Sequence, residues 1–201
     1  MCVFTIKKDE FNNPIRAKSR IVVLGNHETI PWTKSDCYAP VLPSHAVRPL
    51  TALAVQHRTT LKQGDCKNAF CHPVLPEDEI TIVKPPPGCP LSKPNTCWKL
   101  KKTLCGLRRS PSHWFHLVAA KLKEVGLHPL PHEPCIFCGH PIPGHPPLCL
   151  GLHVDDFICF SADTLVEKQF ELDFASKVKV DCMGDVDCFL GVCFQWSRSP
   201  D

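Results

Sequence analysis

Apolar residues along this chain recur with two different periods. Some segments carry them at helical spacing, and others carry them in short runs or in alternation, which is typical of strands. The segments with helical spacing are 44–57, 110–127 and 164–178. The expected strands are 3–8, 17–25, 59–65, 97–107, 148–154, 157–161 and 189–196. Because β-hairpins alternate here with helices that could cover one face of a sheet, the pattern predicts an α+β fold.

The clearest helix is the one expected over residues 110–127. Ser110 is a natural N-cap, Pro111 suits the first helical position, and Gly126 suits the end of the helix. The residues between them form one apolar stripe, made of Trp114, Leu117, Val118, Leu122 and Val125. We interpret this stripe as core packing rather than as a binding surface.

Two adjacent aspartates, Asp155 and Asp156, separate the apolar segments 148–154 and 157–161. A buried carboxylate is costly unless it is paired or bound to a metal, and two neighbouring carboxylates also repel each other. One interpretation is a tight hairpin turn with both side chains in water. The other is a divalent cation site, for which Asp65, at the end of another expected strand, would supply a third carboxylate. The residue pattern leaves both interpretations open.

The net charge of +3 is too small to indicate a partner, but the placement of the charge is more informative. Basic residues gather in two segments, Lys7, Lys8, Arg16, Lys18 and Arg20 in the first, and Lys99, Lys101, Lys102, Arg108 and Arg109 in the second. Such clusters suit a polyanion such as a nucleic acid, and they are equally typical of a solvated hairpin face.

The chain has no apolar run long enough to cross a membrane, and its first residues, MCVFTIKKDE, do not form a signal peptide. We therefore expect no membrane partner and an intracellular location, in the cytoplasm or the nucleus. The 14 cysteines then indicate reduced thiols rather than a disulfide scaffold. The segment HEPCIFCGH, with Cys135 and Cys138 two residues apart, is the best candidate for a zinc site.

Several short motifs, taken in order, resemble the reverse transcriptase domain of copia-type LTR retrotransposons. The matching stretches are KSRIVVLGN, YAPVLPSHAVRPLTALAVQ, GDCKNAF, PPPGC, CWKLKKTLCGLRRSPSHW, EPCIF, HVDD and FLGV. They correspond to family patterns such as D-V-K-N-A-F, P-P-G-F, Y-V-D-D and F-L-G-I. Each motif alone is weak evidence, but all of them keep the family's order over nearly the whole chain.

The resemblance implies a right-hand polymerase fold, in which helices cover one face of an antiparallel palm sheet. The fingers would be residues of about 1–42 and 73–109, and the palm residues of about 43–72 and 110–196. The thumb would be largely missing, because the chain ends where the thumb would begin.

The resemblance also implies RNA-directed DNA polymerase activity, a nucleotidyl transfer on an RNA or DNA primer–template with deoxynucleoside triphosphates. Asp65, Asp155 and Asp156 would be the catalytic carboxylates and would hold two Mg²⁺ ions, with Mn²⁺ as a possible substitute. The residues implied in nucleotide binding are Lys18 and Arg20 for the triphosphate, Phe70 under the sugar, and Gly106 where backbone approaches the template or nucleotide.

The chain departs from the family pattern at several positions. His153 stands where the family has the tyrosine before V-D-D, Cys105 replaces another tyrosine, and Arg109 replaces a glutamine. Three functional hypotheses therefore stay open. The chain is an active polymerase domain, a catalytically dead remnant that binds nucleic acid weakly, or a zinc-binding interaction module built on HEPCIFCGH.

Overall fold

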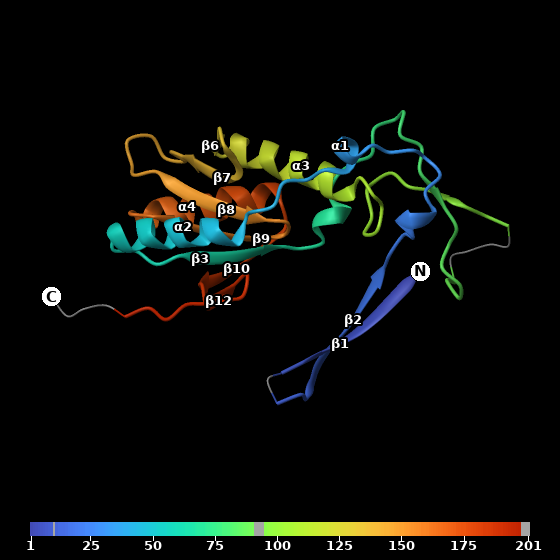
Figure 1. Ribbon diagram of the computed structural model, residues 1–201, viewed down its shortest axis with the longest axis horizontal. Helices are drawn as coiled ribbons and strands as arrows, with labels where there is room; N and C mark the ends of the chain where they lie inside the picture. Colours follow the sequence, from blue (N-terminus) through green and yellow to red (C-terminus); the bar gives the residue numbers. More distant parts are fainter. Residues whose placement is uncertain (10, 91–94, 198–201) are drawn as a thin grey trace. The chain divides into compact units, whose positions relative to one another are not determined.

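The computed structural model describes residues 1–9, 11–90 and 95–197, and the chain forms two compact units (Figure 1). Unit 1 comprises Met1–Tyr38 and Phe70–Trp114, and unit 2 comprises Ala39–Ala69 and Phe115–Asp201. Each unit is made of two separate segments, because the chain passes from unit 1 to unit 2, returns to unit 1, and then enters unit 2 again.

The described residues of unit 1 form two antiparallel strand pairs. The first is β1 (Cys2–Lys8) with β2 (Pro14–Ile21), and the second is β4 (Ile82–Val83) with β5 (Trp98–Lys99). Short helical turns complete it, namely η1 (Gly25–His27), α1 (Lys34–Cys37) and most of η2 (Ala69–Cys71). Only two residues of the segment expected to be extended over 97–107 lie in a described strand, so that prediction was largely wrong.

Unit 2 is built on a six-stranded antiparallel sheet with the strand order β10-β3-β9-β8-β7-β6. Its strands are β3 (Lys62–Cys66), β6 (Leu127–Leu130), β7 (Glu133–Gly139), β8 (Leu148–His153), β9 (Asp156–Ser161) and β10 (Val180–Asp185). The helices are α2 (Ser44–Gln56), α4 (Thr164–Lys177) and α3 (Ser110–Glu124), which begins in unit 1. The α+β class predicted from the sequence is therefore confirmed, with a large antiparallel sheet.

Opposite faces of this sheet pack against different helices, so the expectation that helices cover one face of the sheet was wrong. On one face, Gly151 in β8 leaves space for α2, because a Cβ there would lie 2.8 Å from the Leu50 side chain. On the other face, the ring of Phe157 in β9 makes edge contacts with Phe170 and Phe174 of α4. In Figure 1, α2 (cyan) runs along the β8–β9 hairpin. Packing on both faces buries most residues of the central strands β8 and β9.

Helix α3 confirms the predicted helix but begins differently. Ser110 is its first helical residue rather than its N-cap, and the Ser110 hydroxyl donates to the carbonyl oxygen of Leu104 at 2.7 Å. The carbonyl of Arg109 instead accepts the first hydrogen bond of the helix, from the amide of His113 at 3.0 Å. Gly126 follows the helix with φ of +84°, which fits the predicted glycine stop.

The last expected strand, over 189–196, was wrong. The structure has a small hairpin instead, β11 (Cys188–Phe189) and β12 (Val192–Cys193), with a turn at Leu190 and Gly191. A disulfide joins Cys188 and Cys193, so the expectation of reduced thiols does not hold for this pair. Among the described helices, none is long and apolar enough to cross a membrane.

Candidate functional site

Three carboxylate residues meet at one end of the unit 2 sheet. Asp65 lies near the end of β3, Asp156 is the first residue of β9, and Asp155 lies in the turn between β8 and β9. Asp65 and Asp156 are direct partners across the antiparallel β3–β9 pair. Directly opposed residues of such a pair point to the same face, with Cα atoms roughly 4.5–5.5 Å apart. Strand pairing therefore brings together the acidic residues that the sequence singled out.

The neighbouring strands extend this pair into a polar row across the sheet. Asp181 in β10 is opposite Asp65, and His153 in β8 is opposite Asp156. Lys67 forms an ion pair with Asp181. Nδ1 of His153 lies 3.0 Å from the carbonyl oxygen of Leu42. Asp181 was missed as a member of this site because its strand, β10, was not expected from the sequence.

Packing below the turn fixes its position. Phe157, the residue after Asp156, fills the space that Gly64 leaves on the facing strand, where a Cβ would lie 2.2 Å from the Phe157 ring. The amide of Cys66 donates to the carbonyl oxygen of Asp155 at 2.7 Å, which ties the turn to β3. The predicted pairing of 148–154 with 157–161, with the aspartates at the turn, is therefore confirmed.

The three carboxylates are close enough to affect one another electrostatically. Burial raises the pKa of Asp156, and the charges of Asp155 and Asp65 raise that pKa further, while His153 opposes the shift. The pKa of the Cys66 thiol is also raised, mainly by burial and then by the charges of the same three carboxylates. The site therefore concentrates negative charge, which disfavours the ionised form of Asp156.

This donor set fits a hard cation. Carboxylate oxygens are the ligands that Mg²⁺ and Mn²⁺ prefer, and repulsion between neighbouring carboxylates is relieved when a divalent cation binds. Within residues 1–9, 11–90 and 95–197, no group of three or more His, Cys, Asp or Glu side chains is already arranged around a metal position.

The residues expected to bind nucleotide belong to unit 1, whereas the three acidic residues belong to unit 2. Lys18 and Arg20 are on β2, opposite Thr5 and Val3 of β1. Their side chains share one face of the hairpin with Lys7 and Arg16, which confirms the predicted basic face. Phe70 is half-buried in η2, and its carbonyl oxygen accepts from the Thr103 hydroxyl at 2.6 Å.

Gly106 allows a close backbone approach, and the neighbour is the chain itself. It has φ of +95°, and a Cβ would lie 2.0 Å from the carbonyl oxygen of Val23. The same holds for Gly25, where a Cβ would lie 2.1 Å from the carbonyl oxygen of Gly106. The two glycines thus let segments 23–25 and 105–106 touch. The expected contact between Gly106 and template or nucleotide stays a prediction.

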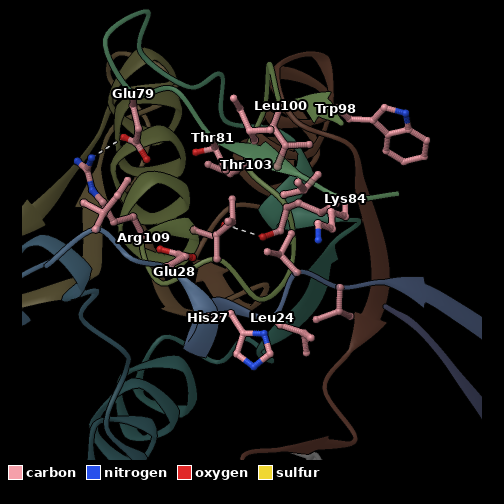
Figure 2. A pocket seen from close by; sticks show the side chains of 18 of the residues that line it. Leu24, His27, Glu28, Glu79, Thr81, Lys84, Trp98, Leu100, Thr103 and Arg109 are labelled. Atoms are coloured by element: carbon pink, nitrogen blue, oxygen red, sulfur yellow. Dashed lines mark hydrogen bonds and ion pairs between the residues drawn. The ribbon is translucent and has the colours of Figure 1, made fainter. Parts of the chain in front are cut away.

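Unit 1 also has a cavity of about 670 Å³, formed by segments 21–32, 79–86 and 98–113 (Figure 2). Most of its wall is apolar, and a charged network lies at one side. Arg109 forms an ion pair with Glu79, whose carboxylate also lies 3.1 Å from His113. The Arg109 guanidinium stacks 4.6 Å above the Trp32 ring. The residue that replaces the family's glutamine is therefore held by side chains of this cavity.

The zinc hypothesis depended on Cys135 and Cys138 acting together. The structure places both in β7, three positions apart, so their side chains point to opposite faces. Cys135 is buried in the core, whereas Cys138 contacts Cys149 of the adjacent strand β8. The observed strand geometry separates the two thiols that a zinc site would need, so it gives the zinc-binding module no support.

Comparison with known proteins gives a consistent result. The profile of a family described as "Reverse transcriptase (RNA-dependent DNA polymerase)" matches residues 1–198. The Pol polyprotein of the tobacco transposon TNT 1-94 is 26% identical over 94% of the chain. That of the Arabidopsis thaliana transposon RE2 is 25% identical over 94%, and the Gag-Pol polyprotein of the yeast transposon Ty1-DR1 is 25% identical over 99%.

These relatives are much longer proteins. The chain spans 14% of the tobacco polyprotein, 13% of the Arabidopsis polyprotein and 11% of the yeast polyprotein. No solved structure gives a significant match.

Proposed function

Because the chain belongs to the reverse transcriptase family, as a domain of the type found in copia-type retrotransposon Pol polyproteins, we propose that it catalyses RNA-directed DNA synthesis at Asp65, Asp155 and Asp156. One observation carries this proposal. Strand pairing and a tight turn gather three carboxylates at one end of a sheet that is packed on both faces. Such a cluster, repulsive by itself, is what phosphoryl transfer assisted by two cations requires.

Asp65, Asp155 and Asp156 would hold two Mg²⁺ ions, for which Mn²⁺ could substitute. When bound, these ions supply positive charge that activates the attacking hydroxyl and neutralises the phosphate in the transition state. The carboxylates of this chain would position the ions. Phe157, packed against α4, would keep the Asp155–Asp156 segment from shifting when charge is added.

We assign unit 1 to the fingers and unit 2 to the palm of a right-hand polymerase. In this assignment the basic face of the β1–β2 hairpin, with Lys18 and Arg20, binds the triphosphate or the primer–template through charge. Phe70 would pack under the sugar of the incoming nucleotide, and Gly106 would lie close to the template or nucleotide.

Primer extension tests this proposal directly. The purified chain would be incubated with an RNA template, a DNA primer, deoxynucleoside triphosphates and Mg²⁺, beside the variant Asp155→Asn. Loss of a metal ligand removes several kcal/mol of transition-state stabilisation, so extension should fall by about 100-fold or more. The control is Asp173→Asn, which removes a carboxylate from the exposed side of α4 and should leave extension unchanged.

A non-catalytic role is the second candidate, because specific residues depart from the family. Arg109 is held by Glu79 and Trp32, and His153 is held near the Leu42 carbonyl oxygen. Primer–template binding without extension, in the wild type as well as in Asp155→Asn, would support a remnant that binds nucleic acid. It would also contradict the catalytic proposal.

A further inference from the structure

Two cysteines of the central sheet face each other in adjacent strands. Cys138 in β7 and Cys149 in β8 are direct partners in the antiparallel register. Their Sγ atoms lie 2.7 Å apart, with the Cys138 thiol directed at the Cys149 sulfur. Both side chains are half-buried and pack against the edge of the core that includes Phe160. Cys138 belongs to the HEPCIFCGH motif, but its neighbouring thiol is Cys149 of β8 rather than Cys135, which the zinc hypothesis required.

We propose that Cys138 and Cys149 form a cross-strand dithiol site that a hydroperoxide oxidises to an intramolecular disulfide. The register makes this bond possible without movement of the strands. Directly opposed residues of antiparallel strands have Cα atoms about 4.5 or 5.5 Å apart, according to their hydrogen-bonding class. Both values lie within the range of roughly 4.4–6.8 Å that disulfides span. The proposal does not depend on polymerase activity.

The environment of the pair makes one sulfur the better nucleophile. The hydrogen bond donated by the Cys138 thiol lowers the pKa of Cys149, and the same bond raises the pKa of Cys138. Cys149 therefore reaches the thiolate form more readily. Because thiolates rather than thiols react with oxidants, Cys149 is the sulfur that would react with the peroxide first.

The chemistry proceeds in two balanced steps. The Cys149 thiolate attacks one oxygen of the hydroperoxide, which forms an S–O bond, breaks the O–O bond and releases hydroxide or an alkoxide. The Cys138 sulfur then attacks the sulfenic acid on Cys149, which forms the S–S bond and breaks the S–O bond. The leaving oxygen takes the thiol proton and departs as water, so two thiols are oxidised and one peroxide is reduced.

Neighbouring cysteines are placed less favourably for this reaction. Cys135 shares β7 with Cys138 but points to the opposite face and is buried. Cys159 is fully enclosed, and burial raises its pKa well above the ordinary value. Among the described contacts, neither Cys135 nor Cys159 has another sulfur as close as the 2.7 Å between Cys138 and Cys149. Among the free cysteines of β7, β8 and β9, oxidation should therefore favour the facing pair.

The test is peptide mapping of the full chain after treatment with hydrogen peroxide and blocking of the remaining thiols. No lysine or arginine lies between Lys123 and Lys168, so trypsin leaves both cysteines in one peptide. Chymotrypsin can cleave after Leu148 and separate them. We expect a linked pair of peptides that contain Cys138 and Cys149, two hydrogens lighter than their sum, which dithiothreitol separates.

Matched variants make the result specific. Cys138→Ser and Cys149→Ser should each abolish the linked species, and Cys149→Ser should also slow the first loss of thiol at low peroxide. Cys135→Ser, on the same strand, should leave the linkage intact. The Cys188–Cys193 disulfide gives a different peptide and serves as an internal reference. The proposal is overturned if Cys138 and Cys149 are both recovered as free thiols, or if the mapped bond joins either of them to a different cysteine.

Discussion

The Asp156 side chain lies opposite one carboxylate and next to another in sequence, and burial and both charges raise its pKa. For an acid whose pKa is higher in the folded state, stability falls as the pH rises from the unfolded pKa through the folded pKa. The loss of folding stability caused by the ionised carboxylate is then fully present at neutral pH and absent at low pH. Asp156→Asn removes the charge and keeps the shape. We expect it to stabilise the protein at pH 7 by roughly 0.2–1 kcal/mol, the scale of a directly opposed like-charge pair.

Urea unfolding of wild type and Asp156→Asn across the pH range measures this effect. The advantage of the variant should shrink as the pH falls towards the ordinary aspartate pKa of about 3.9. Mg²⁺ provides the control at neutral pH, because a cation that binds the folded site stabilises the wild type by mass action. A variant that is less stable than wild type at pH 7 without Mg²⁺ would contradict the repulsion that we infer.

Gly106 provides a second test at the level of a single residue. In Gly106→Ala the new methyl group would lie 2.0 Å from the Val23 carbonyl oxygen, at a φ of +95°. Left-handed backbone costs a non-glycine residue about 1–3 kcal/mol, and overpacking costs a similar amount. We expect the free energy of unfolding to fall by at least about 2 kcal/mol.

Gly144→Ala is the matched control for that substitution. Gly144 has φ of +80°, but nothing lies within 4 Å of its Cβ position, so it isolates the conformational cost. Equal losses in both variants would mean that the contact with Val23 adds nothing. A stable Gly106→Ala protein that loses only primer–template affinity would instead favour the predicted role of Gly106 next to the template or nucleotide.

At the level of secondary structure, the sequence predicted those elements whose periodicity is strong. Helices α2, α3 and α4 and the β8–β9 hairpin carry clear apolar patterns and were found. Strand β10, VDCMGD, was missed because it is an edge strand with mostly exposed side chains and no apolar alternation. Strand β6 is short and contains a proline, which is typical of edges but gives little strand signal.

The candidate site could be predicted only in part for a related reason. Asp155 and Asp156 stand out because they interrupt apolar segments, and Asp65 stands out at a strand end. Their register, which sets Asp65 opposite Asp156, depends on how β3 pairs with β9. Such non-local pairing leaves no local mark in the sequence. The same reason explains why Asp181 and the Cys138–Cys149 pair were not foreseen.

The β1–β2 hairpin separates charge from apolar surface. One face carries Lys7, Arg16, Lys18 and Arg20, and the other exposes apolar residues such as Phe4. If the basic face binds nucleic acid, the double variant Lys18→Gln/Arg20→Gln should bind primer–template more weakly and with less salt dependence. Two lost phosphate contacts should reduce the slope of log K against log salt by about 1.4–1.8.

Binding titrations at several salt concentrations measure that slope. The control is Lys123→Gln/Lys168→Gln, which removes the same charge from exposed positions on α3 and α4. If both double variants reduce the slope equally, the effect is one of net charge alone. The hairpin face would then be a solvated surface rather than a binding surface.

Across the whole molecule, the buried apolar side chains are distributed unevenly between the two units. Among the described residues, unit 1 contributes Leu75, Leu107 and Trp114 to the buried apolar set, and unit 2 contributes all the others. Apolar burial is the main stabilising contribution to folding, so local opening should cost less free energy in unit 1 than in unit 2.

Two antiparallel hairpins make this difference measurable by native-state hydrogen exchange. Strands β8 and β9 are almost wholly buried, whereas β1 and β2 are almost wholly exposed, although both hairpins have regular hydrogen-bonded ladders. We expect amides of β1–β2 to exchange about 100-fold faster or more, which corresponds to an opening free energy lower by about 2.7 kcal/mol. Equal protection would show that the two units open together.

Under the proposed function, adding primer–template should slow amide exchange in β1–β2 and leave exchange in β8–β9 almost unchanged. The reason is that a ligand protects amides most where the free protein opens most easily.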